Sequence, residues 1–148
     1  MNIYPETLLS YLKTLPFLGR VTGSHQTLTA GAMEEILITY EVGAAALADG
    51  AWLKLVFKFY SDWGAFQTTK PQAPNYVSAT YLPRAPFAGE TEATVRQLQV
   101  RYDQKGHERP FQKAVIIDVV DGYLKPGDRI EVRLGDRRFG GPGTRVQT

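Results

Sequence analysis

Apolar and polar side chains alternate with a period of two along most of the chain from residue 33 onward, which is typical of half-buried β-strands. The run 52–60 shows this alternation most clearly, with Lys54 and Lys58 on the side expected to face solvent. The residues on the other side, which we expect to point into the main core, are Leu53, Leu55, Phe57 and Phe59.

Further runs of the same kind predict more strands. The run 129–134 alternates strictly, whereas 114–120 is almost wholly apolar and indicates a central strand covered on both faces. Turn signals such as Pro126-Gly127-Asp128 separate the runs and favour an antiparallel sandwich or barrel. Of the two, we predict a mainly β chain folded as an antiparallel β-sandwich with a short N-terminal helix. The other predicted strands are 36–42, 75–82 and 95–102.

The composition excludes several classes of protein. A chain of 148 residues that is 43% hydrophobic can bury a core, and no apolar run reaches the length of a membrane span. The net charge of +2 argues neither for nor against nucleic acid, but in the arginine-rich segment 129–145 aromatic residues interleave too sparsely for a nucleic-acid surface. Cys is absent, and His25 and His107 are the two histidines, so we expect no disulfide, no metal centre and no cofactor.

Residues 1–18 are predicted to form a short amphipathic helix. Pro5 suits its first turn, and Leu8, Leu12 and Leu15 share one face. This helix either docks a partner or packs on its own domain, and the second interpretation is the simpler one. Because the segment lacks the features of a signal peptide, we expect a cytoplasmic protein. We treat 1–148 as a single β-rich domain in which residues 1–20 are the helix and its connection.

The least regular part of the chain follows the run 52–60, and loops on a rigid sheet often carry binding residues. Aromatic side chains here could stack on a sugar or another flat ligand, with polar neighbours fixing its orientation. Alternatively, the aromatic side chains plug one end of the sandwich. The candidate ligand-binding residues are Asp62, Trp63, Phe66, Gln67, Asn75 and Tyr76.

Three other groups of residues carry side chains of the kinds used in binding or catalysis. Arg137, Arg138 and Arg145 flank a glycine-rich turn and could hold an anion, or they could be solvated. The pair His107 and Glu108 lies in a predicted hairpin turn, where adjacent side chains point apart. The adjacent residues 24 and 25 (Ser-His) are no indication of a catalytic triad, which is a spatial arrangement. No catalytic residue is therefore predicted.

The chain contains, in this order, the short segments Asp49-Gly50-Ala51, Ser61-Asp62-Trp63-Gly64, Gln67, Pro74-Asn75-Tyr76-Val77, Arg109-Pro110-Phe111, Pro126-Gly127-Asp128, Gly135-Asp136-Arg137-Arg138 and Gly141-Pro142-Gly143-Thr144-Arg145-Val146-Gln147-Thr148. Together these segments resemble the N-terminal β-rich region of large bacterial proteins of unknown function. The resemblance covers about residues 34–148, and its most specific part is the closing run from Pro126. Those proteins carry a metallohydrolase-like region, similar to the polymerase and histidinol phosphatase type, further along the chain.

The resemblance implies that this chain is an N-terminal fragment, since the metal ligands of the family lie beyond the equivalent of Thr148. We therefore expect a non-catalytic domain that packs on or positions a catalytic region of a larger protein. The resemblance implies that this larger protein is a metal-dependent hydrolase. The alternative is a module that binds carbohydrate or another small molecule. Residues 145–148 are expected to begin a strand that is cut short, which would leave an open sheet edge for self-association.

Overall fold

The computed structural model describes residues 7–148, and strands dominate its regular structure. This confirms the prediction of a mainly β chain with a short N-terminal helix. The elements are α1 (Leu8–Leu12), β1 (Arg20–Gly23), β2 (Met33–Glu34), β3 (Ile36–Glu41), β4 (Trp52–Phe57), β5 (Val77–Leu82), β6 (Val95–Asp103), β7 (Lys113–Gly122), β8 (Arg129–Leu134) and β9 (Thr144–Arg145).

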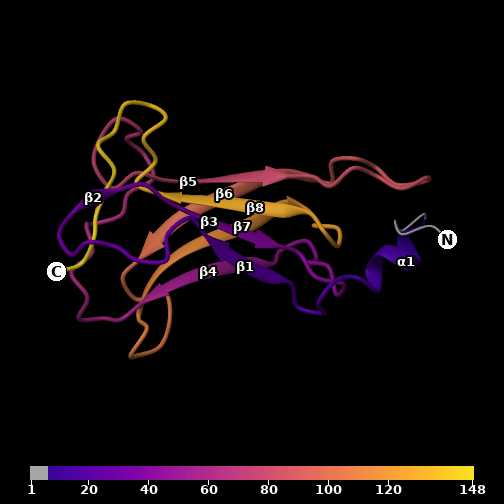
Figure 1. Ribbon diagram of the computed structural model, residues 1–148, viewed down its shortest axis with the longest axis horizontal. Helices are drawn as coiled ribbons and strands as arrows, with labels where there is room; N and C mark the ends of the chain where they lie inside the picture. The colour runs from indigo at the N-terminus through magenta and orange to yellow at the C-terminus, as the bar shows by residue number, and fades with distance from the viewer. Residues whose placement is uncertain (1–6) are drawn as a thin grey trace.

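Two antiparallel sheets form the layers of the sandwich (Figure 1). One has four strands in the order β1-β3-β8-β5, and the other has three in the order β4-β7-β6. Along one side β5 lies against β6, so the layers meet there, while β1 and β4 are the edge strands of the other side. A third pair, β2 with β9, lies at the end of the sandwich where Thr148 is found (Figure 1).

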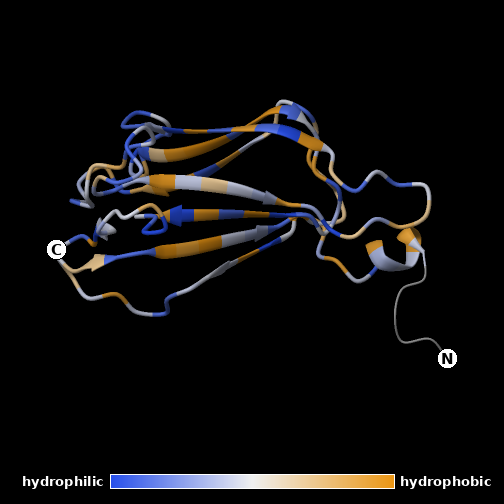
Figure 2. Ribbon diagram, turned by 90° about the horizontal axis from the view of Figure 1, so that it is seen from above, coloured by the Kyte–Doolittle hydropathy of each residue, from blue (hydrophilic) through white to orange (hydrophobic). Residues whose placement is uncertain are grey.

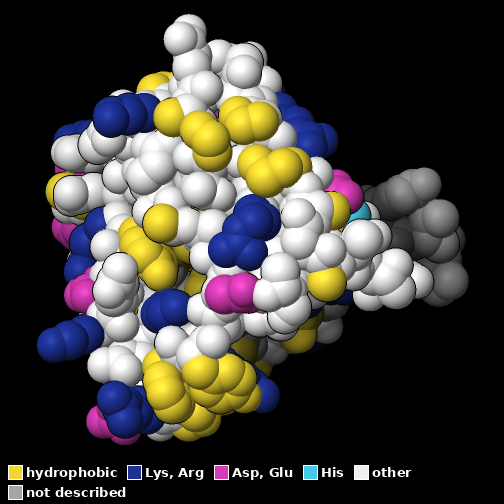
Figure 3. Space-filling view, turned by 90° about the vertical axis from the view of Figure 1, so that its left-hand side faces the viewer, with side chains coloured by type: hydrophobic (Ala, Val, Ile, Leu, Met, Phe, Trp, Pro, Cys, Tyr) yellow, Lys and Arg dark blue, Asp and Glu magenta, His cyan; other side chains and the backbone are white. Residues whose placement is uncertain are grey.

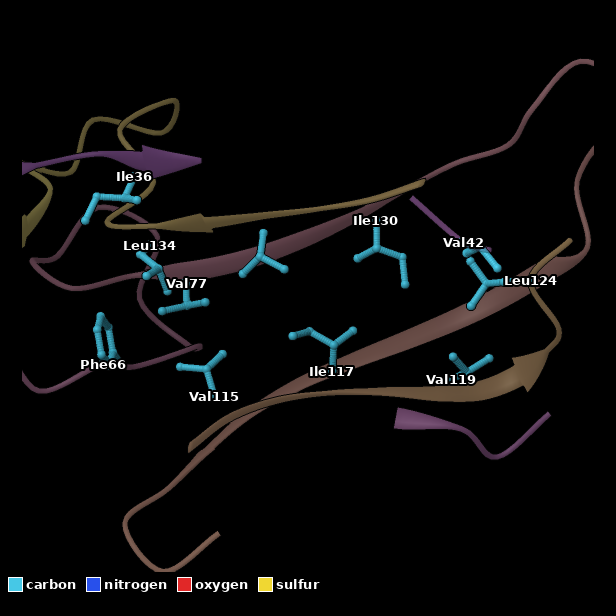
Figure 4. Close-up of a cluster of buried hydrophobic side chains, with 11 residues drawn as sticks. Ile36, Val42, Phe66, Val77, Val115, Ile117, Val119, Leu124, Ile130 and Leu134 are labelled. Atoms are coloured by element: carbon cyan, nitrogen blue, oxygen red, sulfur yellow. The ribbon is translucent and has the colours of Figure 1, made fainter. Parts of the chain in front are cut away.

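The core lies between the two sheets, where side chains from β7 face side chains from β8 and β5 (Figure 4). Alternate residues of each strand supply it, because successive side chains of a strand point to opposite faces. Each fully buried aliphatic side chain stabilises the fold by roughly 1.5–3 kcal/mol. The buried members are Ile36, Val42, Phe66, Val77, Val115, Ile117, Val119, Leu124, Ile130, Val132 and Leu134.

The alternating run at 52–60 forms a strand that is shorter than predicted. Leu53, Leu55 and Phe57 pack against the core, as expected, but β4 ends at Phe57. The chain then leaves the sheet: the amide of Phe59 donates to the carbonyl of Pro110 (2.9 Å), and the Phe59 side chain is 40% exposed. The prediction that Phe59 points into the core is therefore wrong, because the alternation of the sequence continues after the ladder has stopped.

β7 is the central strand of its sheet, as its apolar sequence predicted. Ala114 and Ile116, on the face away from the core, are also buried, and Gly106 of the β6–β7 turn lies directly over them. This cover does not extend along the whole strand, because Val120 is 43% exposed. The two-sided burial predicted for 114–120 thus fails at its last residue. The strand at Arg129–Leu134 has the predicted boundaries.

The N-terminal helix is shorter than predicted and ends at Leu12, before Leu15. The Thr7 hydroxyl caps it by accepting a hydrogen bond from the amide of Ser10 (3.2 Å). The predicted role of Pro5 lies outside the described residues. Tyr11 packs on the same domain, with its ring 5.5 Å from that of Phe87. Figure 2, coloured by hydropathy, shows α1 at the end of the sandwich opposite the C-terminus.

Candidate functional site

All the predicted site residues gather at the end of the sandwich where Thr148 lies. Three loops form this end: 58–76 after β4, 104–112 between β6 and β7, and 135–143 before β9. Figure 3 looks directly at it and shows two hydrophobic patches separated by charged side chains. The loops come together because β4, β6 and β8 all end here.

Trp63 and Phe66 belong to an aromatic cluster that closes the core at this end. The Phe66 ring lies 5.2 Å from the ring of Phe57 and 5.6 Å from that of Tyr102, and its side chain is 5% exposed. Trp63 is half-buried, with its ring 5.7 Å from Phe57. Burial raises the pKa of Tyr102. The faces of Phe66 are occupied by its own chain, so this ring has no free face for a ligand.

Tyr76 and Phe139 form a separate edge-to-face pair, with ring centroids 6.2 Å apart. Phe139 is half exposed and borders a shallow hollow of about 560 Å³. The other lining residues, Lys70, Pro71, Gln72 and Ala73, come from the loop that Gln67 and Asn75 hold in place. Phe139 was not among the residues predicted from the sequence, because a single aromatic residue after two arginines carries no signal.

Gln67 closes this loop by itself. Its Oε1 accepts the amides of Thr69 (3.0 Å) and Lys70 (2.8 Å), and its Nε2 donates to the carbonyls of Lys70 (2.8 Å) and Pro74 (3.2 Å). All the polar atoms of the Gln67 side chain are thus engaged within residues 67–74. Its role here is to shape the loop.

Asn75 joins the loop to β9 from a left-handed backbone position, with φ of 67°. Its side-chain Oδ1 accepts a hydrogen bond from the hydroxyl of Thr144 (2.9 Å), and its backbone N–H donates to the carbonyl of Gly143 (2.9 Å). Gly64 fits closely against this side chain, where a Cβ would lie 2.1 Å from Oδ1. Short polar side chains such as Asn tolerate this backbone region better than others do.

Asp62 and Arg145 form an exposed ion pair at this end of the sandwich. The Arg145 guanidinium donates to the carbonyl of Asp62 and lies 3.7 Å from its carboxylate. The same carboxylate accepts the amide of Thr148 (2.8 Å) and the hydroxyl of Thr148. These hydrogen bonds from Thr148 lower the pKa of Asp62. The carboxylate of Asp62 thus holds the last residue of the chain.

The predicted anion-binding arginines have partners within the chain. Arg138 makes a bidentate contact with Asp136, whose side chain is fully buried, with the shortest distance 2.8 Å. Arg137 donates through its backbone amide to Glu35 (2.7 Å) and through its guanidinium to the carbonyls of Met33 and Pro142. Arg145 pairs with Asp62, as described above. The three arginines therefore anchor the loop 135–143 and β9.

Among the described residues, the side chains of His107 and Glu108 are not hydrogen-bonded to each other, whereas those of Ser24 and His25 are. His107 and Glu108 are both exposed in the β6–β7 turn, and no hydrogen bond joins their described side chains. The Oγ of Ser24 lies 2.7 Å from His25 Nδ1, and His25 Nε2 lies 3.6 Å from Glu34. Ser24 Oγ also accepts a hydrogen bond from the amide of Leu37 (2.9 Å). This contact therefore holds the turn after β1.

One surface at this end was missed by the sequence analysis. We call it the aromatic patch; it lies over the lower part of Figure 3. Tyr60 is 66% exposed and packs edge-to-face with Phe59 at 5.3 Å. The guanidinium of Arg109 lies 4.7 Å from the Phe59 ring, and Lys58 Nζ lies 5.7 Å from the Tyr60 ring. Its members are Lys58, Phe59, Tyr60, Arg109 and Phe111.

No protein-family model, curated protein or solved structure matches this chain. Within residues 7–148, no three His, Asp or Glu side chains are grouped as metal ligands. The same part of the chain contains no helix with the length and apolar content needed to cross a membrane.

Proposed function

We propose that this chain is a non-catalytic β-sandwich domain that packs on, and positions, a further region of a larger protein through the aromatic patch. The observation that carries the proposal is the exposure of Phe59 and Tyr60, each with a cation near its ring, and of Phe111 in the adjoining β6–β7 turn, where the carbonyl of Pro110 accepts a hydrogen bond from the amide of Phe59. Tyr, Phe and Arg are enriched at the centres of protein interfaces, where they supply most of the binding energy. A region joined after Thr148 would begin at this same end of the sandwich (Figure 1).

Outside the aromatic patch, the predicted polar site residues at this end of the sandwich are hydrogen-bonded within the chain. This supports an interface rather than a catalytic site. The side chains of Gln67, Asn75, Asp62 and the three arginines all make hydrogen bonds within their own chain. A rigid end with an aromatic surface is suited to holding a neighbour in a fixed orientation, because little side-chain entropy is lost on docking.

The test has two parts. The reading frame beyond Thr148 should encode a further region, and a stop codon directly after Thr148 would remove the proposal. That region, produced separately, should bind this chain, and Tyr60→Ser should weaken binding by roughly tenfold or more. Tyr123→Ser is the matched control, since Tyr123 is half exposed but follows the far end of β7. Equal affinity of the two variants would rule out the aromatic patch as the interface.

A second candidate, a module that binds carbohydrate or another flat ligand, is favoured by the hollow beside Phe139. A half-exposed aromatic ring next to Lys70 and Gln72 offers a stacking face and polar groups. Titration with simple sugars and short oligosaccharides, followed by amide NMR shifts of residues 70–73, tests it. Saturable shifts that Phe139→Ala abolishes would support binding there.

A further inference from the structure

The two sheets differ by one strand, and this leaves the sandwich open along one side. β5 and β6 lie against each other at the closed side. At the other side, β1 of the four-stranded sheet extends past β4 of the three-stranded sheet. A groove of about 180 Å³ lies between them. Its apolar lining residues are Val21, Ile38, Tyr40, Leu53, Leu55, Ile117 and Val132.

Val21 shows that this side of the core is uncovered. Val21 is paired with Tyr40 across β1 and β3, so both side chains point to the same face of the sheet. That face is the core face, because Tyr40 packs against the core cluster. Val21 is nevertheless 64% exposed, since no strand of the three-stranded sheet lies opposite it.

The edge of β4 beside the groove carries unpaired backbone groups. The amide of Val119 donates to the carbonyl of Ala51, so the bonded pairs with β7 continue at Leu53 and Leu55. The N–H and C=O groups of Trp52, Lys54 and Val56 therefore point away from β7. Within residues 7–148, no hydrogen-bond partner is found for these groups.

We propose that this groove binds one extended peptide segment of a partner, which adds to β4 as a fourth strand. The main-chain groups of Trp52, Lys54 and Val56 would pair with it, and alternate apolar side chains would fill the groove beneath Val21. On the outer face, its side chains would lie opposite Trp52, Lys54 and Val56. Lys54 donates one hydrogen bond to the carbonyl of Gly106 (2.7 Å), and the remaining N–H groups of its ammonium favour an acidic residue at the central position.

The geometry selects a single strand over a second copy of this chain. A second copy that paired its own β4 antiparallel with this one, about a two-fold axis, would place its four-stranded sheet on the same side. Its own overhanging β1 would then occupy the space of β1 and β3 in the first copy. A single peptide strand carries no second sheet, so it fits beside β4, where a second copy of the chain would clash.

The test uses the full chain and a peptide of sequence Ser-Thr-Val-Glu-Val-Thr-Ser. Antiparallel to β4, this peptide directs its two valines inward and its glutamate toward Lys54. A control peptide of the same composition, Ser-Val-Thr-Glu-Thr-Val-Ser, places the glutamate on the same face as both valines. The readout is hydrogen exchange of the amides of Trp52, Lys54 and Val56. Each peptide is added free and, in a second arm, fused after Thr148 through a flexible Gly/Ser linker, which gives an effective concentration in the millimolar range.

We expect the first peptide, and not the control, to slow exchange of these three amides by roughly tenfold or more. Val21→Asp should weaken this protection by roughly tenfold, because it places a charge in the groove. Val120→Asp, at an exposed valine on β7, should leave the protection unchanged. Lys54→Glu should transfer the preference to a peptide with a central lysine.

Three results would overturn the proposal. Equal protection by both peptides would mean that alternation is not recognised. No protection even in the fused arm would mean that the edge does not accept a strand. Protection that appears without peptide as the protein concentration rises, together with dimerisation, would make a second copy the occupant. Because the aromatic patch is elsewhere, Tyr60→Ser should not change any of these outcomes.

Discussion

Asp136 is completely buried, and its carboxylate accepts hydrogen bonds from both the guanidinium and the backbone amide of Arg138. The hydroxyl of Ser78 donates to the same carboxylate at 2.6 Å. This one side chain therefore connects β5 to the loop that leads into β9. The buried charge is compatible with the fold because every side of it is paired.

Replacing Asp136 should destabilise the fold more than replacing an exposed partner of an arginine. Asp136→Asn removes the charge and leaves one amide nitrogen facing donors, so we expect a loss of about 2 kcal/mol. The cost stays moderate because Arg138 is 44% exposed and can be hydrated. Asp118→Asn, which breaks the exposed pair with Arg101, should cost less than about 1 kcal/mol. Urea denaturation of both variants measures the difference, and equal losses would contradict it.

The free energy of unfolding should decrease in acid, because two carboxylates that are stabilised in the folded state become protonated. Burial alone would raise the pKa of Asp136, but hydrogen bonds from Arg138 and Ser78 outweigh it and hold the pKa at about 2. Hydrogen bonds from Arg84 likewise lower the pKa of Glu90 to about 2. Both folded pKa values lie below the unfolded values of about 4, so the folded state stabilises the ionised forms. Their contribution is present above about pH 4 and is lost as the pH falls toward about 2.

Unfolding free energies measured across that range test this pH dependence. Asp136→Asn should lose less stability than the wild type between about pH 4 and about pH 2, because it has one titrating carboxylate fewer. Parallel curves for the two proteins would show that Asp136 is not the group responsible.

Phe57, the last residue of β4, and Phe59, just beyond it, provide a matched pair of substitutions. Phe57→Ala should cost about 3 kcal/mol, because its ring contacts Trp63 and Phe66 in the closing cluster. Phe59→Ala should cost less than about 1 kcal/mol, since Phe59 lies on the surface under Arg109. Chemical denaturation of both variants decides; a larger loss for Phe59 would reverse the assignment of the strand end.

The sequence predicts strands well where alternation and turn residues agree. β8 has the predicted boundaries because Pro126-Gly127-Asp128 precedes it and Gly135 follows it. The end of β4 could not be predicted in this way, since Phe59 and Tyr60 continue the apolar pattern after the backbone has turned toward Pro110. β1 was missed because it has four residues, all exposed, and its core-facing Val21 has no strand opposite it.

The contacts in the candidate site were harder to predict, because they join residues that are far apart in the sequence. The sequence places Arg137 in a basic segment, but its amide hydrogen-bonds to Glu35, 102 residues away. Asp62 and Thr148, 86 residues apart, are likewise brought together by the contact of the loop 58–76 with β9, where the amide of Gly64 donates to the carbonyl of Arg145 (3.0 Å). The excess of arginines in this segment therefore predicted an anion-binding site. In the structure, carboxylates of the same chain lie beside these arginines instead.

Gly64 tests whether the loop and β9 are joined as described. In Gly64→Ala the new Cβ would lie 2.1 Å from Asn75 Oδ1, which also holds the hydroxyl of Thr144. Asn75 would have to move and release that hydrogen bond, so we expect a loss of about 2 kcal/mol. Gly23→Ala is the control, because the nearest atom to its Cβ is 4.0 Å away and its cost should stay below about 0.5 kcal/mol.

A double-mutant cycle identifies the cause of that loss. Asn75 has a φ of 67°, which glycine adopts freely, so Asn75→Gly removes the clashing side chain without straining the backbone. In that background Gly64→Ala should cost much less than it does alone, with a coupling of about 1 kcal/mol or more between the two positions. Urea denaturation of the four proteins gives this coupling. If the two substitutions are simply additive, the contact between Gly64 and Asn75 does not control the packing of the loop against β9.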